Sequence, residues 1–283
     1  MKLRTTLSRT ALYVILCVIA AIFLFPLWLM INISFKADEL QIAREAATVR
    51  SLIPSALSFD NYRSVLKGEG IDAPWTRFFF NSCIIVTSVV VCGLFVNSLA
   101  AFALARLHFR GRHFLISLVV ALIIIPFEGL AVPLFLIVNG FGWFDTYQAQ
   151  IIPFIAHPFS IFLFYQFFNK IPKEFDEAAR IDGASWWQIY YRVAIPLSLP
   201  VIATVAILQS LEYWNSFLWP VMVTRGPEHR PLSVAMNAFF GLPPRRWGDI
   251  MAFALLTALP LLTVYLAFQR WFIKSVAESG LKG

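Results

Sequence analysis

The chain has 283 residues, of which 59% are hydrophobic and only 14% are charged. A soluble domain of this length does not need so much apolar surface, so the composition excludes an ordinary soluble fold. The net charge of +7 does not indicate nucleic-acid binding, because the basic residues stand at the ends of apolar segments rather than in one cluster. This distribution is typical of the positive-inside pattern of membrane proteins. Uncharged runs of about twenty residues recur along the chain and predict membrane-spanning helices.

The three cysteines lie inside these apolar runs. Cys17, Cys83 and Cys92 are odd in number and have hydrophobic neighbours in the sequence. Cysteines in such settings behave as small hydrophobic residues. Their pattern predicts no disulfide framework and no metal site.

The first apolar run begins directly after a basic N-terminus. Lys2, Arg4 and Arg9 lie within residues 1–10, which we assign to the cytoplasm. A secretory signal peptide begins in the same way, but its apolar region is only about 7–15 residues long and ends at small residues. The run seen here is longer and ends in Phe, Pro, Leu and Trp, so it predicts a retained transmembrane helix over 11–34.

A polar segment, 36–76, separates this helix from the next span. The segment is mixed in charge and contains several prolines and glycines, and we expect it outside the cell as a small cap. The uncharged run that follows, 78–105, is long enough to span a bilayer with some tilt. Arg106, Arg110 and Arg112 then form the densest basic turn of the chain, which marks the cytoplasmic side.

Prolines interrupt the third and fourth spans. Residues 114–138 contain Pro126 and Pro133, which predict a kinked helix whose second part lies near the outer surface. The fourth span, 149–168, contains His157. No acidic residue or cysteine lies near this histidine in the sequence, so we expect it to have a structural role.

Two further apolar runs follow, separated by a proline-rich loop, 224–249, that we expect outside the cell. Six spans place both termini on the cytoplasmic side, together with the basic turn and a C-terminal tail, 269–283. The sequence therefore predicts an all-α, multi-pass membrane protein with a single transmembrane domain over 11–283. The predicted spans are 11–34, 78–105, 114–138, 149–168, 197–223 and 250–268.

The loop between the fourth and fifth spans, 170–196, is too polar to lie in hydrocarbon, so it must be an aqueous segment with structure of its own. Acidic residues follow Pro172 in the first turn of a predicted helix, where they favour the helix dipole. Gly183 is a suitable left-handed stop. Ser185 then begins a capping box with Gln188, so the loop predicts a helix, a turn and a second helix.

One face of the first of these helices carries small residues. Phe175, Ala178, Ala179 and Asp182 follow the i, i+3, i+4, i+7 spacing of a single helical face. Two alanines on a charged, exposed helix let another surface approach closely. The alternative is a helix that lies on the membrane surface. Such helices are usually basic, whereas this one is balanced in charge.

Glu177-Ala178-Ala179 and then Asp182-Gly183-Ala184 follow one another in this loop, which resembles the EAA loop of ABC-transporter permeases. The match is closest to the carbohydrate permeases of the maltose type and, among them, to the second-permease subfamily. Two features depart from the pattern. Ser216 stands where the family usually has Asp, and Ser275 to Ser279 replaces a more glycine-rich tail. The residues that carry the resemblance are Glu177-Ala178-Ala179, Asp182-Gly183-Ala184, Pro196, Pro200, Trp214-Asn215, Phe217, Pro220, Trp247-Gly248-Asp249, Gln269-Arg270 and Lys282-Gly283.

The resemblance implies a type I ABC importer permease in a bacterial or archaeal plasma membrane, carrying a sugar or a sugar-like solute. Its loop helix would be a coupling helix that docks on a cytoplasmic ATPase. Its partners would be membrane lipid, a second homologous permease, two ABC ATPases and an extracytoplasmic solute-binding protein that meets 224–249. A simple connector is the alternative for 224–249. The coupling residues implied are Phe175, Glu177, Ala178, Ala179, Asp182 and Gly183.

The chain contains no GxxxxGK[ST] phosphate-binding pattern. We therefore expect ATP and Mg to be bound by the partner ATPases, with no cofactor and no catalytic residue in this chain. Two other functions remain open. A secondary transporter would move protons through Glu212, and a membrane-embedded enzyme would use Glu128, His157 or Glu212. The three residues named for the enzyme lie on different spans, and their spacing is not that of a nucleophile–base pair or of a metal site.

Glu212 lies near the middle of the fifth predicted span, which is otherwise uncharged. A carboxylate at that depth is costly, so it is not expected to face lipid. On one continuous helix it would belong to a polar stripe suited to sugar hydroxyls. The alternative is that the stripe packs on the partner permease. The predicted pathway residues are Gln209, Glu212, Asn215, Ser216 and Trp219.

Overall fold

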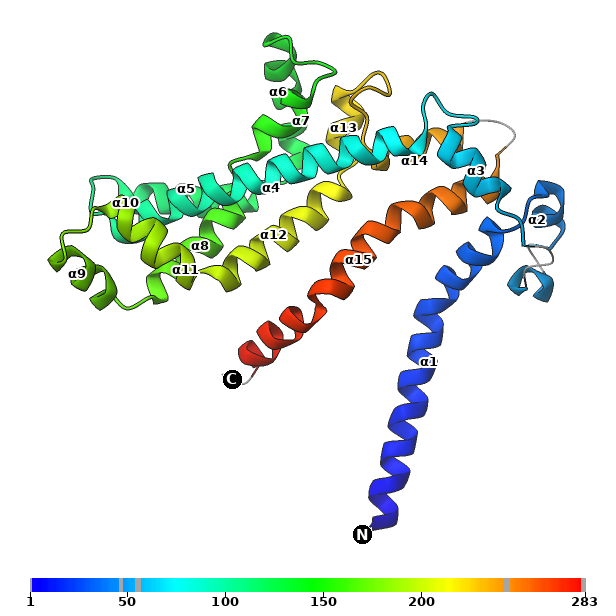
Figure 1. Ribbon diagram of the computed structural model, residues 1–283, viewed down its shortest axis with the longest axis horizontal. Helices are drawn as coiled ribbons and strands as arrows, with labels where there is room; N and C mark the ends of the chain where they lie inside the picture. The colour runs from blue at the N-terminus through cyan, green and yellow to red at the C-terminus, as the bar shows by residue number, and fades with distance from the viewer. Residues whose placement is uncertain (1, 46–47, 54–56, 242–244, 281–283) are drawn as a thin grey trace. The chain divides into compact units, whose positions relative to one another are not determined.

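The computed structural model describes residues 2–45, 48–53, 57–241 and 245–280. Every regular element in these ranges is a helix (Figure 1), as the composition predicts. The chain divides into two compact units. Unit 1 comprises Met1–Thr76 and Ala235–Gly283, and unit 2 comprises Arg77–Val234.

Unit 1 contains the two ends of the chain. Its helices are α1 (Lys2–Ser34), α2 (Glu39–Glu45), η1 (Val49–Leu52), α3 (Asp60–Lys67) and α15 (Trp247–Gly280). Helix α14 (Leu232–Gly241) begins in unit 2 and ends in unit 1. Helix α15 packs against both α1 and α3. The predicted loop 224–249 includes residues 242–244, and the predicted tail includes 281–283. Both of these short segments lie outside the described residues.

Side-chain hydrogen bonds hold the polar segment of unit 1 together. The Asn61 side-chain amide donates to the carbonyl oxygens of Ser34 and Lys36, both at 2.9 Å. The Ser64 hydroxyl donates to the Asp249 carboxylate at 3.0 Å, which joins α3 to α15. Because these polar groups are buried and paired, the segment folds as a compact cap rather than as an open loop.

Unit 2 contains the remaining helices. They are α4 (Trp75–Arg106, almost wholly in this unit), α5 (Arg112–Ile124), α6 (Phe127–Gly140), α7 (Tyr147–Ile151), η2 (Ile152–Phe154), α8 (Pro158–Lys170), α9 (Glu174–Ile181), α10 (Trp186–Ile189), η3 (Tyr190–Ala194), α11 (Ile195–Leu197), α12 (Leu199–Trp214) and α13 (Leu218–Val223). Helix α8 packs against both α5 and α12.

Each predicted span overlaps an apolar helix or a bent pair of helices. By length and composition, the described residues contain three helices able to cross a membrane, or up to five if each of two sharply bent pairs forms one span. Residues 250–263 of the predicted sixth span belong to a shorter apolar helical stretch, Trp247–Thr263. The full-length helices are Ala11–Ser34, Trp75–Arg106 and Tyr147–Lys170, and the bent pairs are Arg112–Ile124 with Phe127–Gly140 and Trp186–Leu197 with Leu199–Trp214.

The third predicted span, 114–138, is not one kinked helix. Helices α5 and α6 meet at an angle of 104°. The break falls at Ile125, which is extended (ψ 119°), and at Pro126, which is also extended (ψ 136°). Proline disfavours the helical conformation of the residue before it and cannot donate a backbone hydrogen bond, so the chain turns sharply there instead of bending gently.

The fifth predicted span, 197–223, is also interrupted. Ser198 lies at the 77° bend between α11 and α12, and Pro200 occupies the first turn of α12. A second break follows Trp214, where α12 ends with Asn215 as its C-cap (φ −93°, ψ 0°). The chain becomes helical again only at Leu218. One continuous helix over 197–223 was therefore a wrong expectation.

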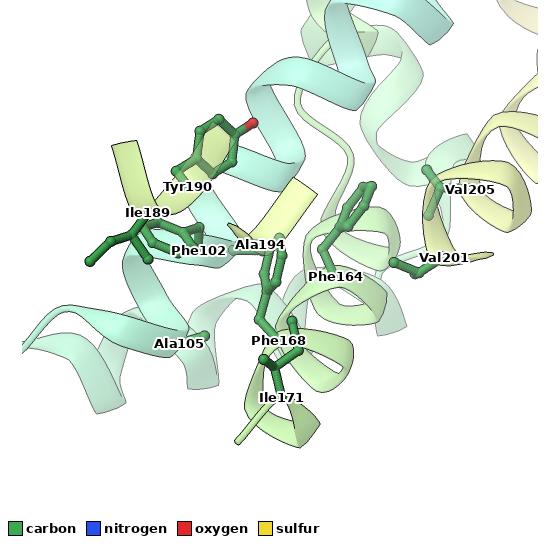
Figure 2. Packing of buried hydrophobic residues seen from close by; sticks show 11 residues of the cluster. Phe102, Ala105, Phe164, Phe168, Ile171, Ile189, Tyr190, Ala194, Val201 and Val205 are labelled. Carbon is green, nitrogen blue, oxygen red and sulfur yellow. The ribbon is translucent and has the colours of Figure 1, made fainter. Parts of the chain in front are cut away.

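A cluster of buried side chains forms one hydrophobic core of unit 2, around the end of α4 (Figure 2). The Phe102 ring packs edge-on against Tyr190, with ring centroids 5.3 Å apart, and against Phe168 at 5.8 Å. Val201 and Val205 of α12 complete the cluster. This core joins α4, α8, η3 and α12, and it gives the polar loop that contains α9 a firm base.

Candidate functional site

Helix α9 and the turn after it have the predicted local structure. Acidic residues occupy the first turn of α9, and Gly183 is left-handed with φ +79°. The Gly183 N–H donates to the Arg180 carbonyl at 3.0 Å, and the Ala184 N–H donates to the Ala179 carbonyl at 2.9 Å. These bonds satisfy carbonyl groups that the helix end would otherwise leave free.

The predicted capping box is confirmed at the start of α10. The Ser185 N–H donates to the Gln188 side-chain oxygen at 2.7 Å, and the Gln188 N–H donates to the Ser185 hydroxyl at 3.3 Å. The Arg180 guanidinium lies over the Trp186 ring, 5.0 Å from its centroid. The two short helices are therefore joined by side chains as well as by the turn.

A buried ion pair holds α9 against the end of α4. Arg106 Nε lies 3.2 Å from Asp176 Oδ2, and the two side chains are only 4% and 11% exposed. A second Arg106 nitrogen donates to the Ile171 carbonyl at 2.8 Å. Burial raises the pKa of Asp176, and the positive charge of Arg106 opposes that rise. The pair fixes the orientation of α9 on the unit.

This anchoring decides which side of α9 is exposed. Asp176 faces the unit, and Ala179, three residues later, is half-buried against the core cluster. The helical spacing predicted that Ala179 shares an exposed face with Phe175 and Ala178. In the structure Ala179 is turned toward the core cluster instead. The exposed surface contains Ile181 instead. Of the other predicted coupling residues, Glu177, Asp182 and Gly183 are exposed.

We define the α9 surface as Phe175, Ala178 and Ile181. The side chain of Phe175 is 50% exposed and that of Ile181 is 87% exposed. Ile181 was not among the predicted coupling residues, although an apolar residue three positions after Ala178 was a usable signal. Exposed apolar side chains on a charged helix are typical of a surface that another protein covers. Figure 1 places α9 next to α10, at one end of unit 2.

A second feature of unit 2 is a cavity of about 600 Å³. It is bounded by residues on both sides of the α5–α6 break, by 153–159 and by residues around the end of α12. Its volume lies within the range of about 300–1,000 Å³ that is usual for small-molecule sites. Its walls are mainly apolar and aromatic, and its polar side chains are those of His157, Glu212, Tyr213 and Ser216.

The cavity brings His157 and Glu212 together. His157 Nε2 lies 3.6 Å from a carboxylate oxygen of Glu212, whose side chain is 55% exposed. His157 also caps α8, because its Nδ1 accepts a hydrogen bond from the Ser160 N–H at 3.4 Å. The expectation that His157 has no acidic partner considered only its sequence neighbours, and the fold supplies one from α12.

The five predicted pathway residues do not form one stripe. Because α12 ends at Trp214, Trp219 lies on a separate helix, where it is buried and its indole N–H donates to the Ala149 carbonyl at 2.9 Å. Gln209 is buried, at 1% exposure. Asn215 is exposed, and its amide donates back to the Leu211 carbonyl. Of the five, the cavity is lined by Glu212 and Ser216.

The remaining enzyme candidate, Glu128, is exposed in the first turn of α6 and does not line the cavity. Within the part of the chain that the structure describes, no group of three His, Cys, Asp or Glu residues is placed to hold a metal ion. His157 and Glu212 alone offer two ligands, fewer than a closed protein metal site uses.

Comparisons with known proteins agree with this fold. A family model described as "Binding-protein-dependent transport system inner membrane component" matches residues 90–278. An arabinooligosaccharides transport system permease of Halalkalibacterium halodurans is 35% identical, over 94% of this chain and 93% of that protein. A trehalose/maltose transport system permease of Thermococcus litoralis is 31% identical, with 98% of each chain covered.

Among solved structures, a chain of a bacterial ABC transporter involved in the import of the acidic polysaccharide alginate superimposes with a TM-score of 0.80. The two chains are 24% identical, and the match covers 94% of this chain and 97% of that one. At this identity the likeness establishes the fold, which is that of a type I ABC importer permease.

Proposed function

The chain belongs to the family of inner-membrane components of binding-protein-dependent transport systems, and we propose that it is the permease subunit of an ATP-driven importer for a sugar. Two relatives named as sugar permeases, each matched over more than nine-tenths of its length, support this proposal. The chain is a pathway-forming subunit and not an enzyme. Because its sequence lacks a phosphate-binding loop, ATP and Mg belong to separate ATPase subunits.

One observation carries the coupling mechanism: α9 is held rigidly while its apolar side chains remain exposed. The Arg106–Asp176 pair fixes the inner side of the helix, and Phe175 and Ile181 project from the outer side. A rigid, partly apolar surface can be covered by a partner without much loss of side-chain freedom. The α9 surface is the docking site for the ATPase, and ATPase movements reach the membrane helices through it.

The full complex follows from the same proposal. It contains a second homologous permease, two ATPases, membrane lipid and an extracytoplasmic solute-binding protein, in a bacterial or archaeal plasma membrane. Both termini of this chain are cytoplasmic, on the side of α9, and loop 224–249 faces the solute-binding protein. The basic residues near α9, including Arg106 and Arg112, support this orientation.

The docking proposal is tested with Ile181→Ser in the assembled complex. The side chain is 87% exposed, so the substitution should leave folding and membrane insertion unchanged. In the docked complex the ATPase would bury this side chain, so replacing it with serine should weaken docking about tenfold or more. Solute-stimulated ATP hydrolysis should fall in parallel. Glu174→Gln, an exposed change in the first turn of α9, is the matched control.

The outcome that contradicts docking is normal stimulation in both Ile181→Ser and Phe175→Ser. Wild-type hydrolysis in these two variants would mean that the α9 surface does not meet the ATPase. Cross-linking of α9 to a membrane lipid instead of to the ATPase would support the membrane-surface alternative.

A proton-coupled transporter is the second candidate, because His157 and Glu212 form an imidazole–carboxylate pair in unit 2. Such pairs occur in proton pathways. The two functions differ in their energy source. ATP-driven import stops when ATP is removed and continues when the proton gradient is collapsed, whereas proton-coupled import behaves in the opposite way.

A further inference from the structure

The His157 and Glu212 side chains offer complementary hydrogen-bonding groups to the cavity. The Ser160 N–H can only donate, so His157 Nδ1 accepts from it and the neutral ring carries its proton on Nε2. That N–H is a donor on the side of Glu212, whose ionised carboxylate is an acceptor. The gap of 3.6 Å between Nε2 and the carboxylate oxygen is longer than a direct hydrogen bond.

A hydroxyl group fits this arrangement because it both accepts and donates. It would accept from His157 Nε2–H and donate to the Glu212 carboxylate, and each of the two protein groups would gain a hydrogen bond that it lacks in the direct pair. Two neighbouring hydroxyl groups, as on a sugar ring, would bind His157 and Glu212 at the same time. Hydrogen bonds to an ionised group are the stronger kind, so Glu212 would contribute most.

The position of the imidazole is fixed by groups behind it. Asn97 of α4 accepts from the His157 backbone N–H at 2.9 Å and donates to the Ile155 carbonyl at 3.1 Å. The Ser160 hydroxyl lies 2.8 Å from His157 Nδ1. An imidazole held in this way is preorganised, and a bound hydroxyl does not have to order it.

The walls of the cavity suit the apolar face of a sugar ring. Phe127, Phe154, Phe159 and Tyr213 all line it, and the Phe154 and Tyr213 rings lie 5.6 Å apart. Aromatic walls with a few placed polar groups are typical of small-molecule sites. Trp219 packs behind Phe154 at 5.7 Å and supports that wall without lining the cavity.

The charge of the lining selects among sugars. Among the described residues that line the cavity, His157 and Glu212 are the only ones of the His, Lys, Arg, Asp or Glu types, so this lining supplies one carboxylate and no permanent cation. A sugar acid would place its own carboxylate in a mainly apolar cavity with a like charge and no fixed counter-charge. We propose that the His157–Glu212 pair is a saccharide site that takes neutral sugars by their hydroxyl groups and excludes acidic ones. This proposal rests on the import function and is independent of the α9 docking.

The first test uses the assembled transporter with four probes: trehalose, maltotriose, arabinotriose and an alginate trisaccharide. We expect import of at least one neutral probe and none of the alginate trisaccharide. With the imported neutral probe, Glu212→Leu should raise the apparent KM about tenfold or more, because a hydrogen bond to a charged group is lost. Complex assembly should not change. Glu128→Leu, outside the cavity, is the matched control.

A second test separates direct binding from a remote effect. Ser216→Cys, in a variant lacking the native cysteines, places a thiol in the cavity wall while leaving the His157–Glu212 pair intact. The imported sugar should slow alkylation of this thiol by a small neutral reagent. It should not slow alkylation in Leu136→Cys, an exposed position on α6 outside the cavity.

Several results would overturn the proposal. Import of the alginate trisaccharide alone, or of none of the four probes, contradicts the preference for neutral sugars. An unchanged KM in Glu212→Leu, or no protection in Ser216→Cys, shows that the sugar does not bind here. A Ser216→Cys thiol that stays unreactive without sugar means that a partner chain fills the cavity. Failure of α9 docking appears in the ATPase assays of Ile181→Ser and leaves these readouts unaffected.

Discussion

The Arg106–Asp176 pair should behave as a buried ion pair. Replacing one partner should lower the local stability of α9 more than replacing both. At 3.2 Å the Coulomb attraction is about 5 kcal/mol for an effective dielectric constant of 20. Burial of both charges opposes it, and the raised pKa of Asp176 indicates that burial outweighs the attraction for the carboxylate. Asp176→Asn leaves Arg106, which is 4% exposed, without its counter-charge, and should cost about 3 kcal/mol.

The sign of the pH dependence follows from the raised pKa. Asp176 holds its proton more firmly in the folded protein than in the unfolded chain, where its pKa is near 3.8. Its contribution to stability is therefore fully present below that value and is lost as the pH rises through the raised pKa. At neutral pH the cost of Asp176→Asn comes from the uncompensated Arg106 and not from loss of a favourable anion.

Amide hydrogen exchange in α9 of the assembled complex measures this cost. A loss of about 3 kcal/mol in local stability should speed α9 exchange by about 100-fold. The double variant Arg106→Met/Asp176→Leu should exchange more slowly than Asp176→Asn, because it leaves no unpaired charge. Glu174→Gln on the exposed side should match the wild type. Equal or faster exchange in the double variant than in Asp176→Asn would refute this account.

Three other changes have definite expected outcomes. Gly183→Ala should cost about 1–2 kcal/mol in thermal unfolding, because the φ of +79° penalises any Cβ although no atom lies within 4 Å of it. Gly248→Ala should destabilise unit 1 more, since its Cβ would meet the Asn61 side chain, with Oδ1 at 2.8 Å; unchanged exchange in α3 would contradict this. Hydrogen bonds from Lys36 and then Gln41 lower the pKa of Glu45, so this contribution to the stability of unit 1 is present above pH 4.5, the ordinary pKa, and is lost as the pH falls through the lowered value. Lys36→Met should weaken that pH dependence in acid titrations of unfolding, and an unchanged dependence would contradict this account.

Local signals predicted the polar loop well. The turn at Gly183 and the Ser185–Gln188 capping box depend on residues at most five positions apart, and both form as expected. The inward side of α9 could not be predicted in this way. It is set by Asp176, whose partner Arg106 lies at the far end of another helix, and this partner turns Ala179 inward and Ile181 outward.

The cavity was less accessible to prediction for a similar reason. Prolines indicated where the third span weakens, but hydropathy cannot distinguish a gentle kink from a 104° break. The predicted stripe of pathway residues required one continuous helix. The break after Trp214 separates Trp219 from Glu212. The contact between His157 and Glu212 joins α8 to α12 and has no local pattern.

Helix α4 holds both candidate sites of unit 2. Asn97 binds the backbone of the segment that presents His157 to the cavity, and Arg106 binds Asp176 on the inner side of α9. The two positions are roughly 14 Å apart along the axis at 1.5 Å per residue. Neither proline nor glycine interrupts the helix between them, so this stretch should move as a rigid rod. A displacement of α9 that preserves the Arg106–Asp176 pair therefore also moves the support of the imidazole. Because packed cores respond by discrete rearrangement rather than by continuous deformation, a docking partner that moves α9 can change the sugar site without contacting it.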